Sequence, residues 1–157
     1  MPAPNPLDYP AISNTLARYC LALDTKDFAL LHRVFTPDVH AIYPFGGHIQ
    51  GVQPVADAIQ KRLAPISSQH ALTTQHLAIA ADGRSAEATT YFTGIHFGQG
   101  KWAGQQVTAW GKYVDTLTLF PESGVDVLPG SSGQWLVSRR EVGFMARMGE
   151  EGVMEGE

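Results

Sequence analysis

Apolar residues recur with a helical period in the first third of the chain. From Tyr9 onward, one stripe has offsets of 0, 4, 7, 8 and 11 residues, which is the spacing of one helix face. The stripe consists of Ile12, Leu16, Tyr19, Cys20 and Leu23. The same period predicts two shorter helices, over about 28–35 and 54–63. Each should end before a proline, Pro37 or Pro65, because the residue preceding a proline avoids the helical region.

The later part of the chain has the pattern of strands. Segments of about 70–80, 85–97, 105–119 and 134–145 are rich in Thr, Val, Tyr, Trp and Ile. Residues 38–51 predict a short strand, a turn at Gly46-Gly47 and a returning strand. Helices followed by strands indicate an α+β domain, with helices on one face of an antiparallel sheet. Four long strands around three short helices should leave a pocket on the concave side and a face for a second copy on the convex side.

Length and charge indicate one domain. The chain has 157 residues, and we expect a flexible arm over 1–8, a single domain over 9–147 and a disordered acidic tail over 148–157. Four of the 15 acidic residues lie in the last eight positions, and the other 11 balance 11 basic residues. A neutral body without clustered Lys or Arg argues against nucleic acid and against a polybasic membrane patch.

Cysteine usage and hydropathy indicate the compartment. Cys20 is the only cysteine, so no internal disulfide can form and a reducing environment is acceptable. The N-terminus lacks the basic and apolar regions of a signal peptide. No apolar run reaches the roughly 20 residues that cross a bilayer. We therefore expect a cytoplasmic protein without membrane contact.

Motifs for several kinds of chemistry are missing from the sequence. It contains no P-loop, no GxGxxG and no GxSxG. Its six histidines form no HExxH or HxH pattern, and there is no CxxC. We therefore expect no metal and no cofactor, and acid/base chemistry remains.

Asp24 and His76 are the main candidates for that chemistry. Asp24 lies at the C-terminal end of the first predicted helix, where the helix dipole disfavours a carboxylate. His76 lies in "TTQHLAI", on an alternating face with Leu72 and Thr74. A carboxylate bonded to one imidazole nitrogen fixes the tautomer and makes the other nitrogen more basic. The alternatives are that Asp24 caps the second helix and that His76 is a core residue.

Other residues complete the expected site. His96 could be a second proton donor, or lie in solvent at a strand end, and Tyr43 could polarise a substrate oxygen or merely line the wall. The expected substrate-binding residues are Phe45, Thr74, Phe92, Trp110 and Phe144. Of Arg139 and Arg140, one should face inward. The remaining histidines, expected at the surface, are His32, His40, His48 and His70.

The segments "ALDTKDFALLHRVFTPDV", "TTQHLAI" and "GQWLVSRREV" together resemble the SnoaL-like group of the nuclear transport factor two-like superfamily, and within it the scytalone dehydratases. The resemblance spans about Tyr9 to Met145. It implies a cone-shaped, strongly curved antiparallel sheet wrapped around three N-terminal helices, usually as a dimer or trimer. It also implies proton transfer without a cofactor by Asp24 and His76. Leu23 differs from the dehydratase, which has a tyrosine there.

The resemblance further implies a second histidine, His96, and a tyrosine that holds the substrate oxygen, Tyr43. Trp110 differs from the dehydratase, which has an asparagine at about that position. We therefore expect a cofactor-independent dehydratase, double-bond isomerase or cyclase of secondary metabolism, acting on a polyketide- or terpenoid-like molecule. In this scheme His76 removes a proton α to a carbonyl, Tyr43 holds the enolate oxygen, and His96 protonates a departing hydroxyl or the far end of the dienol.

Two points stay open at the level of sequence. Elimination and double-bond migration need the same base, so the residues do not distinguish them. A non-catalytic module that binds small molecules or mediates assembly would have the same fold. The expected partners are a small hydrophobic oxygenated substrate and a second copy of the chain, bound through the convex face of the sheet.

Overall fold

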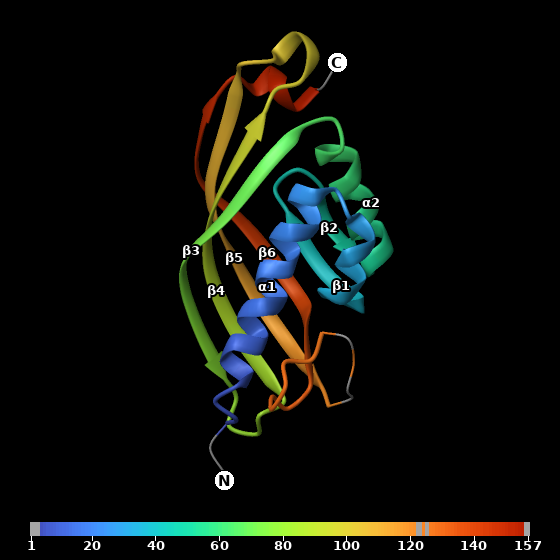
Figure 1. The fold of residues 1–157 in the computed structure, drawn as a ribbon, viewed down its shortest axis with the longest axis vertical. Coiled ribbons are helices and arrows are strands. Elements are labelled where there is room, and N and C mark those ends of the chain that lie inside the picture. Colours follow the sequence, from blue (N-terminus) through green and yellow to red (C-terminus); the bar gives the residue numbers. More distant parts are fainter. Residues whose placement is uncertain (1–3, 122–123, 125, 156–157) are drawn as a thin grey trace.

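The computed structural model describes residues 4–121, 124 and 126–155 as an α+β fold, with helices against one face of a curved sheet (Figure 1). Three elements, η1, η2 and η3, are short 3-10 helices. The elements in chain order are α1 (Asp8–Thr25), η1 (Phe28–Arg33), β1 (Phe35–Tyr43), β2 (Gly47–Gln50), α2 (Val52–Leu63), β3 (Ser67–Ile79), β4 (Ser85–Phe97), η2 (Gly100–Trp102), β5 (Gln106–Phe120), β6 (Gln134–Gly149) and η3 (Glu151–Glu155).

The sheet has six strands in the order β2-β1-β6-β5-β4-β3. Figure 1 shows the long strands β3 to β6 passing behind α1, with α2 and the β1–β2 hairpin at one side. The predicted α+β cone is confirmed. The sheet is mixed rather than antiparallel throughout, because β1 and β6 run parallel. Parallel neighbours need a long connection. Here the chain between β1 and β6 forms β2, α2, β3, β4, η2 and β5.

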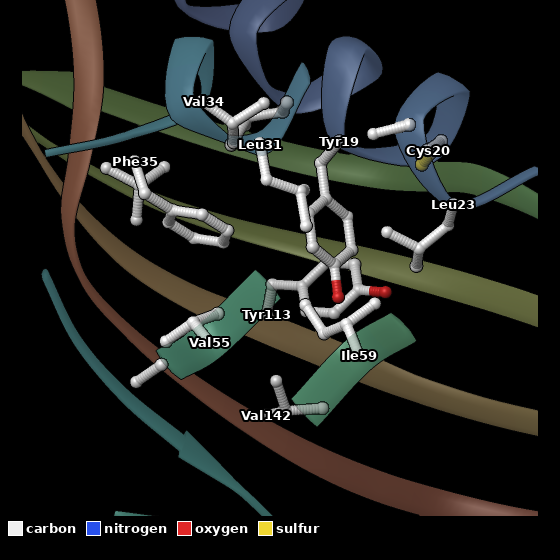
Figure 2. Close-up of a cluster of buried hydrophobic side chains, with 14 of the residues drawn as sticks. Tyr19, Cys20, Leu23, Leu31, Val34, Phe35, Val55, Ile59, Tyr113 and Val142 are labelled. Carbon is white, nitrogen blue, oxygen red and sulfur yellow. The ribbon is translucent and has the colours of Figure 1, made fainter. Parts of the chain in front are cut away.

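The helical stripe predicted for α1 is buried as expected. Ile12, Leu16, Tyr19 and Leu23 are each at most 2% exposed. Figure 2 shows Tyr19 and Leu23 of α1 among side chains from η1, α2 and the sheet, including Leu31, Ile59 and Tyr113. Burying each large apolar side chain contributes roughly 1.5–3 kcal/mol, so this cluster holds the helices against the sheet.

The second predicted helix is shorter than expected. Its regular part, η1, ends at Arg33, and Phe35 begins β1 instead of ending the helix. Val34 and Phe35 are good strand formers, and Val137 N–H donates to the Val34 carbonyl. Pro37 lies where the β1–β6 register shifts, which suits a residue without an N–H.

The C-terminal segment is ordered, so the predicted disordered tail over 148–157 is wrong for residues 148–155. β6 continues to Gly149, and Val153 of η3 is fully buried. A Cβ on Gly152 would lie 2.3 Å from the Trp102 ring, which shows how closely η3 packs on the β4–β5 connection. Two neighbouring apolar residues among glutamates, Val153 and the partly buried Met154, dock the segment on the core. Residues 156–157 lie outside the described residues.

The described residues of the predicted arm, 4–8, are attached to the segment before β6. Helix α1 begins at Asp8, one residue earlier than expected, and its carboxylate accepts hydrogen bonds from the backbone and hydroxyl of Ser132. The Asn5 side chain donates to the Gly130 carbonyl. Residues 1–3 of the predicted arm lie outside the described residues.

Within the described residues, no helix combines the length and the apolar character needed to span a bilayer.

Candidate functional site

Asp24 lies in the last turn of α1 and accepts three hydrogen bonds from β3. The Ser68 hydroxyl and His70 Nδ1–H donate to Oδ1, at 2.9 and 2.7 Å, and the His70 backbone N–H donates to Oδ2 at 2.8 Å. Burial opposes ionisation of Asp24, but the hydrogen bonds from His70 and Ser68 lower its pKa below the ordinary value. These donors explain why a carboxylate is tolerated at the negative end of a helix.

The expected pairing of Asp24 with His76 is wrong, because His70 takes that place. The cause is a β-bulge in β3. Leu72 pairs with Phe92 of β4, but the next pair is Gln75 with Thr90, so β3 has one extra residue there. Alternation of faces is therefore broken between His70 and His76.

The bulge reverses which residues of β3 face the helices. Beyond it, the odd-numbered positions point inward: the Gln75 side chain bonds to Ser13 of α1 and to Thr90. His76 and Thr74 are exposed. Neither the expected general base nor the expected Thr74 contact is therefore in the pocket.

His70 and His96 lie together on the pocket wall. Their ring centroids are 5.8 Å apart in an edge-to-face arrangement, and both rings line the pocket. Asp24 is not a lining residue of this pocket. It lies behind His70 and lines a second, more open hollow with Cys20 and Leu21. Asp24 is thus placed to orient His70, not to touch a molecule in the pocket.

The hydrogen bonds define the proton positions on both rings. A carboxylate and a carbonyl only accept, so Nδ1 of His70 donates to Asp24 and Nδ1 of His96 donates to the Val107 carbonyl at 3.1 Å. Burial, with a smaller effect of His70, lowers the pKa of His96 to about 4. His96 is therefore neutral near pH 7 with a lone pair on Nε2. It is an acceptor there, not the expected proton donor.

Gly94 of β4 makes room for the two imidazoles. A Cβ at this position would lie 3.3 Å from Cδ2 and 3.4 Å from Nε2 of His70, and 3.6 Å from Cε1 of His96. A side chain would crowd the rings, so the glycine permits their close approach to the strand.

The pocket predicted on the concave side is present. It is a hollow of about 460 Å³, counted to its open mouth. Five expected site residues line it, namely Tyr43, Phe45, Phe92, His96 and Phe144. Trp110 does not, because Phe92 pairs with Gly111, and Trp110 pairs with Thr93 on the opposite face. Apart from the histidines and two arginines, the lining is aromatic or aliphatic.

Tyrosine hydroxyls lie at the inner end of the pocket. The Tyr19 and Tyr43 hydroxyl oxygens are 3.0 Å apart, and Tyr19 packs edge-to-face on Tyr113 (Figure 2). Burial raises the pKa of all three tyrosines, so they stay protonated near neutral pH. In the Tyr19–Tyr43 pair one hydroxyl donates to the other, which leaves one hydrogen for a further acceptor.

Arg140 is the inward-facing member of the Arg139–Arg140 pair. It is fully buried and donates from Nε and Nη2 to Asp115, at 2.7 and 2.8 Å. Its Cζ lies 4.3 Å from the Tyr19 ring centroid and 4.0 Å from that of Tyr113. Its charge also opposes the rise in the Tyr43 pKa. Arg139 is half exposed.

The sequence reasoning missed His70, Tyr19, Tyr113 and the Asp115–Arg140 pair. Leu23 stands where the dehydratase has a tyrosine, and Tyr19, one helical turn earlier on the same stripe, provides a hydroxyl instead. Gly94 was the available signal for His70, because a glycine inside a strand often marks a close approach. Among the described residues, no group of three or more His, Cys, Asp or Glu side chains is placed to hold a metal ion.

Comparisons with known proteins agree with this architecture. The family profile described as SnoaL-like domain matches residues 6–141. No functionally curated protein matches the chain. A solved structure from Novosphingobium aromaticivorans, provisionally named a scytalone dehydratase, is 16% identical with a TM-score of 0.73, over 92% of this chain and 89% of that one.

Two further solved structures are similar. The hexachlorocyclohexane dehydrochlorinase LinA-type3 from Novosphingobium barchaimii is 12% identical with a TM-score of 0.72, over 93% of this chain and 92% of that one. A nuclear transport factor 2-like superfamily protein from Salmonella enterica is 19% identical with a TM-score of 0.68, over 93% and 94%. At these identities the likenesses establish the fold.

Proposed function

Because the chain belongs to the SnoaL-like domain family, and because an Asp–His pair lies at its pocket, we propose that it is a cofactor-independent lyase or isomerase. The reaction begins with removal of a proton from carbon next to a carbonyl. The observation that carries the proposal is the 2.7 Å hydrogen bond from His70 Nδ1 to Asp24, with His70 at the pocket wall.

His70 takes the role that the sequence suggested for His76. With Nδ1–H bonded to the carboxylate, Nε2 is the nitrogen available to receive a proton. The Asp24 carboxylate stabilises the imidazolium that forms and keeps the ring in the required tautomer. Asp24 acts through His70 and is a positioning residue.

The tyrosine pair stabilises the charge that develops on the substrate oxygen. When the α-proton leaves, negative charge moves to the carbonyl oxygen, and the free hydrogen of the Tyr19–Tyr43 pair can donate to it. The Arg140 cation beside these tyrosines favours such charge. A positioned donor of this kind is worth about 3 kcal/mol in comparable enzymes.

His96 has a different role from the one expected. Its neutral ring offers Nε2 as an acceptor, so it can accept a hydrogen bond from a hydroxyl of the substrate. The aromatic lining suits a small hydrophobic oxygenated molecule of polyketide or terpenoid type. The names dehydratase and dehydrochlorinase both denote eliminations, which supports a lyase over an isomerase or cyclase.

The proposal is tested by exchange of the α-proton with solvent. Removal of this proton is the first step that we propose for elimination, isomerisation and cyclisation alike. α-Tetralone, a small bicyclic ketone, is incubated in D₂O, and deuterium at its α-carbon is followed by NMR. We expect the protein to accelerate exchange, His70→Ala to abolish the acceleration and His76→Ala, on the same strand, to retain it. Equal rates for wild type and His70→Ala would favour a non-catalytic binding module.

We also propose a homodimer through the convex face of the sheet. Tyr91, Phe97 and Val114 are each 39% exposed, and Tyr91 and Val114 lie on adjacent strands of this face. Such a patch favours association. Light scattering at micromolar concentration should give twice the monomer mass, and Val114→Lys should shift the mass toward the monomer. A monomeric wild type would contradict the dimer.

A further inference from the structure

Two arginines lie at the pocket and leave it with a net positive charge. Arg62 from α2 and Arg147 from β6 both line it. The Arg62 guanidinium carbon lies 4.4 Å from the Phe45 ring centroid, and that of Arg147 lies 5.2 Å from the Phe144 centroid. Each cation is therefore held over an aromatic ring that also lines the pocket.

Arg147 has a carboxylate partner and Arg62 has none among the described residues. Glu151 of η3 accepts from Nε and Nη2 of Arg147, both at 2.9 Å. The remaining nitrogen, Nη1 of Arg147, is buried and has no hydrogen-bond partner. Among the described residues, no carboxylate lies within ion-pair distance of Arg62. Two positive charges thus face one negative charge.

The pKa shifts of the neighbouring groups agree with this excess of positive charge. Burial and repulsion from Arg147 lower the pKa of Arg62, which Glu151 opposes. Both arginines also contribute to the lowered pKa of His96. Guanidinium groups nevertheless keep their proton at neutral pH, so the repulsion persists until an anion enters. A buried donor without a partner is costly, and it is typically satisfied by a ligand or water.

We propose that the substrate carries a carboxylate, which binds Nη1 of Arg147 and the guanidinium of Arg62. A single carboxylate matches the single excess positive charge, and the planar guanidinium fork matches its two oxygens. The hydrophobic part of the substrate then lies among Phe45, Phe92 and Phe144. This inference rests on the proposed function, for which it names the substrate class.

The test compares two small probes of the same shape. trans-Cinnamate carries a carboxylate, and cinnamamide replaces it with a neutral amide. By isothermal titration calorimetry at low salt, wild type should bind cinnamate at least about tenfold tighter than cinnamamide. The preference should decrease at high salt, because the added ions screen the arginines.

Matched variants locate the effect. Arg62→Gln and Arg147→Gln should each reduce the preference to about threefold or less. Arg139→Gln removes the same charge from β6 outside the pocket and should retain the full preference. Arg147→Gln also loses the ion pair with Glu151 and could loosen η3, so Arg62→Gln is the decisive variant. A preference below threefold in wild type, no binding of cinnamate, or an unchanged preference in Arg62→Gln would overturn the proposal.

The binding test is independent of the proposed reaction. His70→Ala removes the base but neither arginine, so it should keep the preference for cinnamate. Loss of α-tetralone exchange with the preference retained would leave the carboxylate site standing without the reaction. Exchange without the preference would retain the reaction and remove the carboxylate site.

Discussion

Two acid–base pairs in the same domain differ in what they can do. Asp24–His70 lies at the side of the pocket, where the Asp24 side chain is 22% exposed, and one imidazole nitrogen is free. Asp115–Arg140 lies beneath the tyrosines, where the Asp115 side chain is 0% exposed and Arg140 uses two nitrogens on it. We propose that the first pair takes part in proton transfer, whereas the second pair keeps its charges inside the fold.

The difference comes from the partner and its burial. An imidazole gains and loses a proton near neutral pH, whereas a guanidinium does not. The neighbouring carboxylate and tyrosines outweigh the effect of burial and raise the pKa of Arg140 well above its ordinary value. A carboxylate paired with a basic side chain therefore indicates catalysis only when the basic side chain can gain and lose a proton and reaches a pocket.

The largest effect should come from breaking the buried pair. Arg140→Met leaves the Asp115 carboxylate buried without its partner, so the free energy of unfolding should fall by about 3–5 kcal/mol, measured in urea. The double variant Arg140→Met/Asp115→Leu removes both charges and should recover most of that loss. If Arg140→Met alone is as stable as wild type, the buried pair does not contribute to stability as expected here.

The next effect should be on catalysis. Asp24→Asn should lower the rate of α-proton exchange at least about a hundredfold, because the amide does not stabilise the imidazolium. The loss of stability should be smaller than in Arg140→Met, since the site is partly exposed. Rates and urea unfolding on the same samples separate the two regions. If Asp24→Asn lost stability but kept its exchange rate, the Asp24–His70 pair would be structural rather than catalytic.

His96 should make the pocket wall sensitive to acid. Its folded pKa of about 4 lies below the ordinary histidine value of 6.5, so the unfolded chain binds a proton that the folded chain excludes. The stability from the neutral ring is complete above pH 6.5 and is lost as the pH falls toward 4. Between pH 7 and 5 the loss is about 2 kcal/mol. His96→Asn should remove that part of the slope in urea unfolding, and an unchanged slope would contradict it.

The smallest effect should come from crowding His70. Gly94→Ala places a methyl group 3.3 Å from its ring, and we expect a decrease of up to about tenfold in exchange, with a loss of stability under about 2 kcal/mol. Gly143→Ala is the matched control in β6, where an added Cβ meets nothing within 4 Å. Equal rates in the two variants would mean that the His70 position tolerates movement.

The sequence predicted the elements because their periods are long and regular. Strand β4 was expected over 85–97 and is found there, and the stripe of α1 is buried as expected. Strand alternation and the family resemblance point to Asp24, His96 and Tyr43, and the structure places His96 and Tyr43 in the pocket lining and Asp24 behind His70. Pro37 predicts the end of a helix, but it lies within β1 at a shift of register.

The partner of Asp24 could not be derived from alternation alone. One extra residue between Leu72 and Gln75 reverses the face, and neither residue carries a sequence signal for a bulge. The prediction that Trp110 lines the pocket was wrong for a related reason. The register between β4 and β5 decides which residues of the two strands face the same way, and it places Trp110 opposite Thr93 rather than Phe92. The C-terminal segment is ordered because η3 packs on Trp102, which is distant in the sequence. Amino-acid composition does not reveal such a long-range contact.

The central claim is that Asp24 orients His70 as the general base. The most direct measurement is long-range proton–nitrogen NMR of the imidazole rings near neutral pH. The account predicts that neutral His70 carries its proton on Nδ1 in wild type and shifts toward the Nε2–H form in Asp24→Asn, while His76 gives the same spectrum in both. A His70 ring protonated on Nε2 in wild type, or unchanged in Asp24→Asn, would contradict the account.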